Sequence, residues 1–261
     1  MAGDLVKPLA VLVRSPGTNN ERETAHAFEL AGARVAEHPL EALVRDALPL
    51  KEAQILMFPG GFSYGDDLGA GRIAALRIRT ALADSVRAHL DRGGLVMGHC
   101  NGFQILVQTG LLPGIPGPGG GPAATLALNA SGRFECRWVP LRVVHPGIFL
   151  KGLGSFWLPV AHAEGRFQTA APEILETLKS QGQIAVVYRM PDGGVPSYPF
   201  DPNGSEAQIA GVTDPTGRIL GMMPHPERFV RREQHPSWRR EALPEEGLGL
   251  RVYRNAVEHF A

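Results

Sequence analysis

Short runs of apolar residues with no internal alternation recur in the first hundred residues and predict buried β-strands. They lie at 9–13, 54–58 and 94–98, and 34–36 is a shorter candidate. Helices are predicted between them, at 21–31, 40–47 and about 70–92. Apolar strands that alternate with helices are typical of a parallel sheet covered on both faces, so we expect an α/β fold.

The second half of the chain has a different pattern. Residues 134–139 alternate between apolar and polar, as a half-exposed strand does. The other predicted elements are strands at 156–161, 184–188, 209–212 and 219–223 and helices at 171–180 and 250–260. We interpret the Gly/Pro-rich segment 113–122 as a surface loop, because the strands on either side of it complete one sheet. The pattern therefore predicts one domain over residues 1–261.

Cys100 lies where the apolar strand 94–98 meets the start of a helix, between Gly98 and Gly102. This spacing is that of a nucleophile elbow, a sharp turn that exposes a reactive side chain on a strained backbone. Side chains at 98 and 102 would collide with the neighbouring elements. The helix N-terminus favours a thiolate. A cysteine is more often a small buried hydrophobic residue, and hydrolases, glutaminases and DJ-1-like proteins all use such elbows.

His225 and Glu227 follow the strand 219–223 directly. Two residues apart, they are expected on the same side of an extended segment. A carboxylate in that position can hold an imidazole in one tautomer and stabilise its charged form. The alternative is a surface turn with a solvated ion pair. Together with Cys100 the two residues supply a nucleophile, a base and an orienting group.

Composition excludes several classes of function. The chain is 44% hydrophobic and 20% charged, and its 26 basic and 26 acidic residues balance, so no basic field indicates nucleic acid. The run 93–132 has no charged residue but is too rich in Gly and Pro for a membrane helix. Residues 1–8 do not resemble a signal peptide. Cys100 and Cys136 make no disulfide framework, so we expect a cytoplasmic protein.

Several sequence motifs occur in a fixed order along nearly the whole chain. They are PGGFSYGD (59–66), GxCNGFQxL (98–106), GLLPG (110–114), AHxEGRF (161–167), NGS (203–205) and GMMPHPER (221–228). Together they resemble the class I glutamine amidotransferases, and within them the PurQ-type glutaminase subunits of phosphoribosylformylglycinamidine synthase. The CNGFQ and MMPHPER motifs are far more specific than the elbow alone.

The resemblance implies a flavodoxin-like domain with a mixed, mostly parallel sheet that hydrolyses glutamine to glutamate and ammonia. Cys100 would be the nucleophile, His225 the base and Glu227 the orienting group. The resemblance also implies that the backbone N–H groups of Asn101 and Gly61 stabilise the oxyanion. A further expected substrate contact is Gln104, one helical turn after Cys100, although it can equally be a packing residue.

The expected partner is a synthetase, because the chain has no GxxxxGK[ST] phosphate loop. The resemblance implies a PurL-type subunit that uses ATP and Mg to convert formylglycinamide ribonucleotide to formylglycinamidine ribonucleotide in purine biosynthesis, together with a small PurS-type subunit. No cofactor, metal, nucleic acid or membrane is expected for this chain. The rival interpretations are a glutaminase subunit of another amidotransferase and a non-catalytic DJ-1-like module, which would be expected to lack the His225–Glu227 pair.

Some positions depart from the pattern of the family. His99 stands where an aliphatic residue is usual, Asn20 where a cysteine is common, and Ala163 where a glycine is common. We expect His99 to turn into the core rather than toward the thiolate, because the residue beside an elbow nucleophile usually faces the interior. His162 and Glu164 belong to a family motif, but the sequence assigns them no role.

Overall fold

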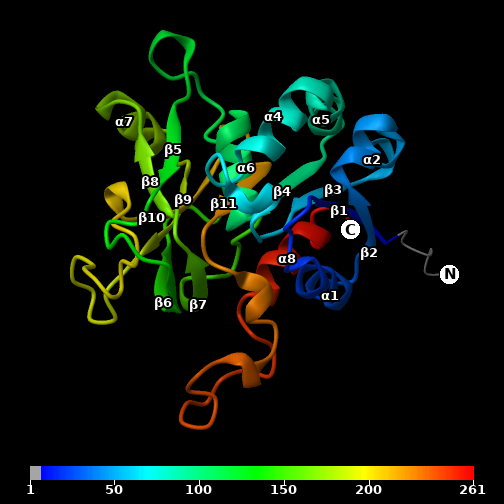
Figure 1. The fold of residues 1–261 in the computed structure, drawn as a ribbon. Helices are drawn as coiled ribbons and strands as arrows, with labels where there is room; N and C mark the ends of the chain where they lie inside the picture. Colours follow the sequence, from blue (N-terminus) through cyan, green and yellow to red (C-terminus); the bar gives the residue numbers. More distant parts are fainter. Residues whose placement is uncertain (1–6) are drawn as a thin grey trace, which may run out of the picture.

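The computed structural model describes residues 7–261, and Figure 1 shows its central sheet with helices on both faces. The first six residues of the predicted domain lie outside the described residues. So does most of the stretch 1–8, in which no signal peptide was recognised. Among the described residues, no helix combines the length and the apolar character needed to cross a membrane.

One half of the nine-stranded sheet is parallel. Its strand order is β2-β1-β3-β4-β11, and every neighbouring pair is parallel. The bounds are β1 (Leu9–Arg14), β2 (Arg34–Pro39), β3 (Ile55–Phe58), β4 (Leu95–His99) and β11 (Ile219–Met222). Parallel strands end at the same edge of the sheet, so the residues that follow β3, β4 and β11 meet there.

The other half continues the sheet with antiparallel neighbours, β10 (Ile209–Thr213), β9 (Ile184–Tyr188), β6 (Glu135–Val143) and β7 (Ser155–His162). Within this sheet β10 and β6 run against the other strands, so the predicted mixed, mostly parallel sheet is confirmed. A second sheet pairs β5 (Ala124–Ala127) with β8 (Arg166–Thr169). The sequence analysis missed these two strands, because four residues show too little periodicity.

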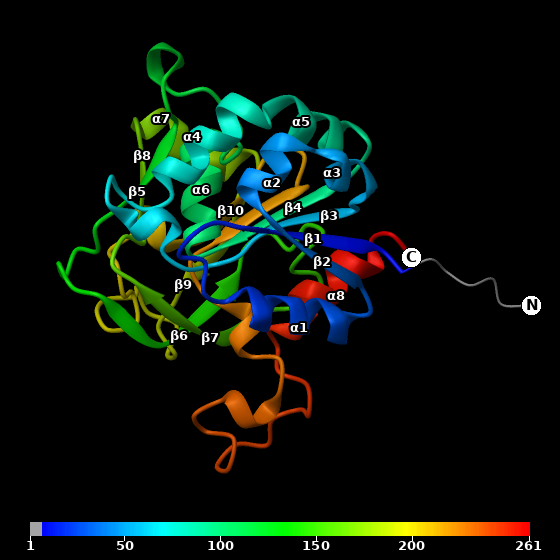
Figure 2. The same ribbon diagram turned by 45° about the vertical axis from the view of Figure 1, so that its right-hand side comes forward.

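Helices cover both faces of the large sheet (Figure 2). On one face lie α1 (Glu21–Ala31) and α8 (Leu250–Glu258). The helices packed on the other side are α2 (Leu40–Arg45), α3 (Leu48–Glu52), α4 (Arg72–Ala81), α5 (Ala83–Asp91), α6 (Asn101–Thr109) and α7 (Pro172–Ser180). The strands are apolar on both faces because both faces are buried.

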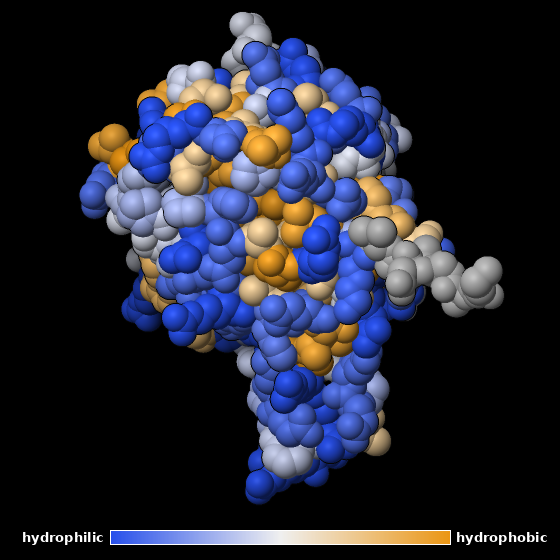
Figure 3. All heavy atoms as spheres, turned by 90° about the vertical axis from the view of Figure 1, so that its right-hand side faces the viewer, coloured by the Kyte–Doolittle hydropathy of each residue, from blue (hydrophilic) through white to orange (hydrophobic). Residues whose placement is uncertain are grey.

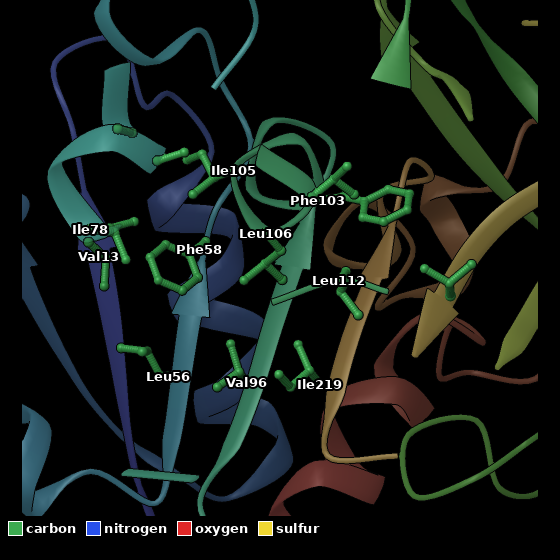
Figure 4. Packing of buried hydrophobic residues seen from close by; sticks show 14 of the residues in the cluster. Val13, Leu56, Phe58, Ile78, Val96, Phe103, Ile105, Leu106, Leu112 and Ile219 are labelled. Carbon is green, nitrogen blue, oxygen red and sulfur yellow. The ribbon is translucent and has the colours of Figure 1, made fainter. Parts of the chain in front are cut away.

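The pleat of β4 decides which way the residues around the elbow point. Val96 packs toward α6, in the cluster that Figure 4 shows with Phe58 and Leu106, whereas Met97 packs toward α8. Side chains alternate along a strand, so Gly98 faces α6 and His99 faces α8. The expectation that His99 turns into the core is confirmed, since its side chain is completely buried.

The predicted long helix 70–92 is wrong. The structure has two helices, α4 and α5, separated at Leu82, whose ψ of 1° is not helical. The break bends the chain so that Ile78 of α4 and Val86 of α5 both reach one core. The predicted helix 40–47 is confirmed as α2, and a separate short helix, α3, follows it outside the predicted range. The sequence analysis missed α3 because the helix is short and contains Pro49, which interrupts the apolar pattern. Proline is nevertheless well suited to the first turn of a helix, which is where Pro49 lies.

Residues 231–247 project from the body as a polar lobe, seen at the bottom of Figure 3, where hydrophilic residues predominate. An isolated bridge between Arg231 and Glu246 closes its base. The predicted surface loop 113–122 is confirmed as largely exposed, with one short 3-10 turn at Pro118–Gly120.

Candidate active site

Cys100 occupies a strained turn between β4 and α6. Its φ of 52° and ψ of −110° lie where residues other than glycine are rare. A Cβ on Gly98 would lie 2.6 Å from the Gly102 carbonyl carbon, and one on Gly102 would lie 1.8 Å from the Phe58 oxygen. The predicted elbow and its need for two glycines are confirmed.

Two backbone carbonyls contact Cys100. Its N–H donates to the Met222 oxygen over 2.9 Å, which fixes the turn to the end of β11. Its Sγ lies 3.4 Å from the Ala161 oxygen near the end of β7. The thiol therefore lies where the ends of β4, β11 and β7 meet.

His225 and Glu227 form a buried pair, with 2.5 Å between Nδ1 and Oε1. The predicted extended segment is wrong, because a 3-10 turn, Pro226–Arg228, begins directly after His225. Proline is well suited to the first position of such a turn. The turn brings the Glu227 carboxylate against the His225 imidazole. The predicted side-by-side placement of the two groups is nevertheless found, and the solvated surface pair is excluded by the burial.

The electrostatics of this pair favour the charged form of both groups. Burial lowers the pKa of His225, but the Glu227 carboxylate and the nearby Cys100 sulfur outweigh burial and raise that pKa well above its usual range. For Glu227 burial raises the pKa, and the charge and hydrogen bond of His225 outweigh it, so the pKa falls. The site therefore holds an imidazolium against a carboxylate.

Asn20 is a member of this site that the sequence analysis did not select. Its fully buried Nδ2 donates to Glu227 Oε1 over 2.5 Å and lies 3.2 Å from His225 Nδ1. Asn20 directly precedes α1, but its side chain makes no capping bond to that helix. The only feature of the sequence that singled out Asn20 was its departure from the family pattern, in which a cysteine is common at this position.

The predicted oxyanion and substrate residues lie around Cys100. Asn101 Oδ1 accepts from the Ser63 N–H over 3.1 Å, which ties loop 59–67 to the elbow. A Cβ on Gly60 would lie 3.1 Å from His225 Cε1, so the glycine pair at 60–61 borders the base. Gly61 itself has a φ of 143°. The structure thus brings Gly61 and Asn101 to the site, and their role as oxyanion donors stays a prediction.

Gln104 is buried between two neighbours. Its Oε1 accepts from Asn101 Nδ2 over 2.9 Å, and its Nε2 donates to the Glu164 carbonyl oxygen over 2.6 Å. One amide hydrogen and one oxygen lone pair are left for a ligand. A contact with glutamine stays a prediction.

His162 and Glu164 lie behind the residues that surround Cys100 and hold neighbouring segments in place. Burial lowers the pKa of His162 to about 3, helped by the charge of His225, so this imidazole is neutral. Its Nδ1 lies 3.0 Å from Asn129 Oδ1. Glu164 Oε2 accepts from the Ala70 N–H over 3.2 Å and so anchors the start of the α4 region.

The site is closed in this structure. Cys100 is 5% exposed, His225 2% and Gln104 5%. Loop 59–67 lies against the elbow, and its residues Tyr64 and Asp66 have positive φ values of 56° and 57°. Little of the thiol and of its neighbours is therefore exposed to solvent in this structure.

Comparisons with known proteins find similar sequences over nearly the whole chain. A family model described as a CobB/CobQ-like glutamine amidotransferase domain matches residues 7–260. The chain is 46% identical to phosphoribosylformylglycinamidine synthase subunit PurQ of Dehalococcoides mccartyi over 97% of each chain. It is 37% identical to the PurQ subunit of Methanococcus maripaludis strain C5 over 97% of this chain and 98% of that one.

Solved structures show the same likeness. A chain in the structure of PurLQS from Thermotoga maritima is 31% identical, with a TM-score of 0.73 over 98% of this chain and 100% of that chain. A putative GMP synthase subunit of Thermoplasma acidophilum shares the fold at 14% identity, with a TM-score of 0.57 over 97% of this chain and 94% of that chain.

Proposed function

Because the chain belongs to the PurQ family of glutamine amidotransferases, we propose that it releases ammonia from glutamine for the synthesis of formylglycinamidine ribonucleotide in purine biosynthesis. The observation that carries the proposal is a strained elbow cysteine next to a buried imidazolium–carboxylate pair. The proposal treats residues 1–261 as a single glutaminase domain.

The Cys100 thiolate attacks the side-chain amide carbon of glutamine. His225 holds the thiol proton and gives it to the departing nitrogen, so ammonia leaves and a γ-glutamyl thioester forms. Water then attacks the thioester, and His225 takes a proton from the water and returns it to the sulfur as glutamate leaves. Glu227 stabilises the charged imidazole, consistent with the raised pKa of His225.

Two backbone N–H groups are proposed to stabilise the tetrahedral oxyanion. The first N–H of α6, that of Asn101, has no partner within the helix and carries the positive end of its dipole. The other is that of Gly61, in the loop held beside the elbow through Asn101 and Ser63. We propose that Gln104 uses its remaining amide hydrogen and lone pair on the substrate.

An electrophilic glutamine analogue should label Cys100 and spare Cys136. The expectation follows from the site, because only Cys100 lies beside a base, whereas Cys136 is exposed on β6. A small alkylating agent without the glutamine shape is the control and should modify Cys136 first. Peptide mapping reads both. Labelling of Cys136 by the analogue, or failure of glutamine to protect Cys100, would count against the assignment.

We propose that the partner is a PurL-type synthetase that uses ATP and Mg, with a small PurS-type subunit. The proposal is supported by the likeness to a chain of PurLQS and by exposed apolar side chains at the rim of the site. Phe62 and Phe134 are 44% and 50% exposed with ring centroids 6.3 Å apart, and Leu68 is 67% exposed. Exposed apolar groups beside a closed site fit a docking surface. The cytoplasm is the compartment that we propose.

Glutamine hydrolysis by the isolated chain should be slow and should rise at least about tenfold when the synthetase complex is added, because docking must open the buried site. Steady-state assays with and without PurL-type and PurS-type subunits measure the effect. Formation of formylglycinamidine ribonucleotide in the same mixture tests the function.

The matched control for this experiment is Phe134→Ser, which lies outside the catalytic group. It should leave the isolated rate unchanged and weaken the stimulation. An isolated chain that reaches the rate of the full complex would refute the gating by docking but not the glutaminase chemistry.

A further inference from the structure

The second oxygen of Glu227 contacts two groups that the proposed reaction does not use. His99 Nδ1 lies 3.4 Å from Oε2, and the Tyr253 hydroxyl lies 3.4 Å from the same oxygen. His99 comes from β4, one residue before the nucleophile, and Tyr253 comes from α8. All three side chains are buried.

Tyr253 is a fixed hydrogen-bond donor. Burial, together with the charge of Glu227, raises the pKa of Tyr253 well above its usual value, so the hydroxyl keeps its proton. Its ring packs edge-on against Phe28, with centroids 4.8 Å apart and an interplanar angle of 85°. The packed ring therefore holds the hydroxyl within reach of Glu227 Oε2, which is 3.4 Å away.

His99 is a donor as well. Its Nδ1 faces the carboxylate and the Tyr253 oxygen, which is 3.2 Å away, while Nε2 has no partner among residues 7–261. If the only proton were on Nε2, a buried N–H would have no hydrogen-bond partner. The lone pair of Nδ1 would also face the lone pairs of the carboxylate, which is repulsive. The proton on Nδ1 avoids both costs.

Glu227 thus accepts two contacts on each oxygen. His225 and Asn20 contact Oε1, whereas His99 and Tyr253 contact Oε2. A carboxylate held only through Oε1 can rotate about its last bond, and rotation would lengthen the 2.5 Å contact with His225. Contacts on Oε2 oppose that rotation.

We propose that His99 and Tyr253 are positioning residues, which keep Glu227 aimed at His225 throughout the glutaminase reaction; this inference rests on the proposed function. His99 also precedes Cys100 in the chain. The end of β4 therefore positions two catalytic groups. It leads into the turn that holds Cys100, and through His99 it contacts the carboxylate of Glu227.

The test compares His99→Leu, His99→Asn and Tyr253→Phe in the synthetase complex. The loss of one hydrogen bond to a charged group is expected to lower kcat about tenfold in His99→Leu and Tyr253→Phe, with KM changed less than about twofold, because neither side chain is proposed to contact glutamine. An asparagine at 99 can place its amide nitrogen near the position of Nδ1, so His99→Asn should recover most of kcat. Tyr253→Phe removes one oxygen atom and is expected to fold.

The decisive readout is the effect of the same changes on Glu227→Gln. If His99 and Tyr253 act through the carboxylate, His99→Leu and Tyr253→Phe should cause no further loss of kcat in that background. An equal loss in both backgrounds, or wild-type kcat in the single variants, would overturn the inference. The proposed function has a separate test, because activity that remains in Cys100→Ala would contradict it whatever the variants at His99 and Tyr253 show.

Discussion

Cys100→Ala and Cys100→Ser should each abolish glutamine hydrolysis, by at least about a thousandfold, and leave the fold intact. The nucleophile is lost outright, since alanine has none and a serine hydroxyl is far less acidic than a thiol. Stability should change little, because the side chain is small and the positive φ of Cys100 strains alanine or serine as it strains cysteine. Steady-state glutaminase assays and thermal unfolding measure the two effects.

Cys136→Ala is the matched control for these variants. Cys136 is exposed and lies on β6, so its loss should leave both the rate and the unfolding midpoint unchanged. More than a trace of wild-type rate in Cys100→Ala would remove Cys100 as the nucleophile. A large drop in the unfolding midpoint would instead show that the thiol has a structural role.

The sequence was most informative where local chemistry decides the structure. The helix at Glu21–Ala31 and the strand at Ile184–Tyr188 have the bounds that the pattern predicts, because clear apolar segments end at glycine or polar residues. The break at Leu82 was not predictable in this way. Both halves of the region 70–92 are good helix, and the break is needed only for Ile78 and Val86 to reach one core in the assembled fold.

In the site, too, features set by neighbouring residues could be predicted, and features set by the assembled fold could not. The elbow could be predicted, because Gly98, Cys100 and Gly102 are close in sequence and their collisions are local. Asn20 and Tyr253 could not, since each reaches Glu227 only after the strands and helices are assembled. Pairing of His225 with Glu227 was predicted for the wrong reason, through an extended segment instead of a 3-10 turn.

His225→Ala should lower kcat/KM by about a thousandfold or more, and Glu227→Gln by about ten- to a hundredfold. Without His225 no group remains to hold and return the proton, whereas Glu227→Gln leaves a base of poorer geometry. The order is tested by steady-state kinetics of the two variants in the synthetase complex. Equal rates would mean that Glu227 does more than orient His225, or that His225 does less than transfer protons.

The pH profile of Glu227→Gln separates these roles further. The Glu227 carboxylate raises the pKa of His225, against the opposing effect of burial, so its removal should lower that pKa. The limb of the pH–rate profile that reports His225 should therefore move to lower pH. A profile that keeps its wild-type limbs while kcat falls would show that Glu227 positions the imidazole without controlling its charge. A limb that moves to higher pH would contradict the imidazolium–carboxylate pair itself.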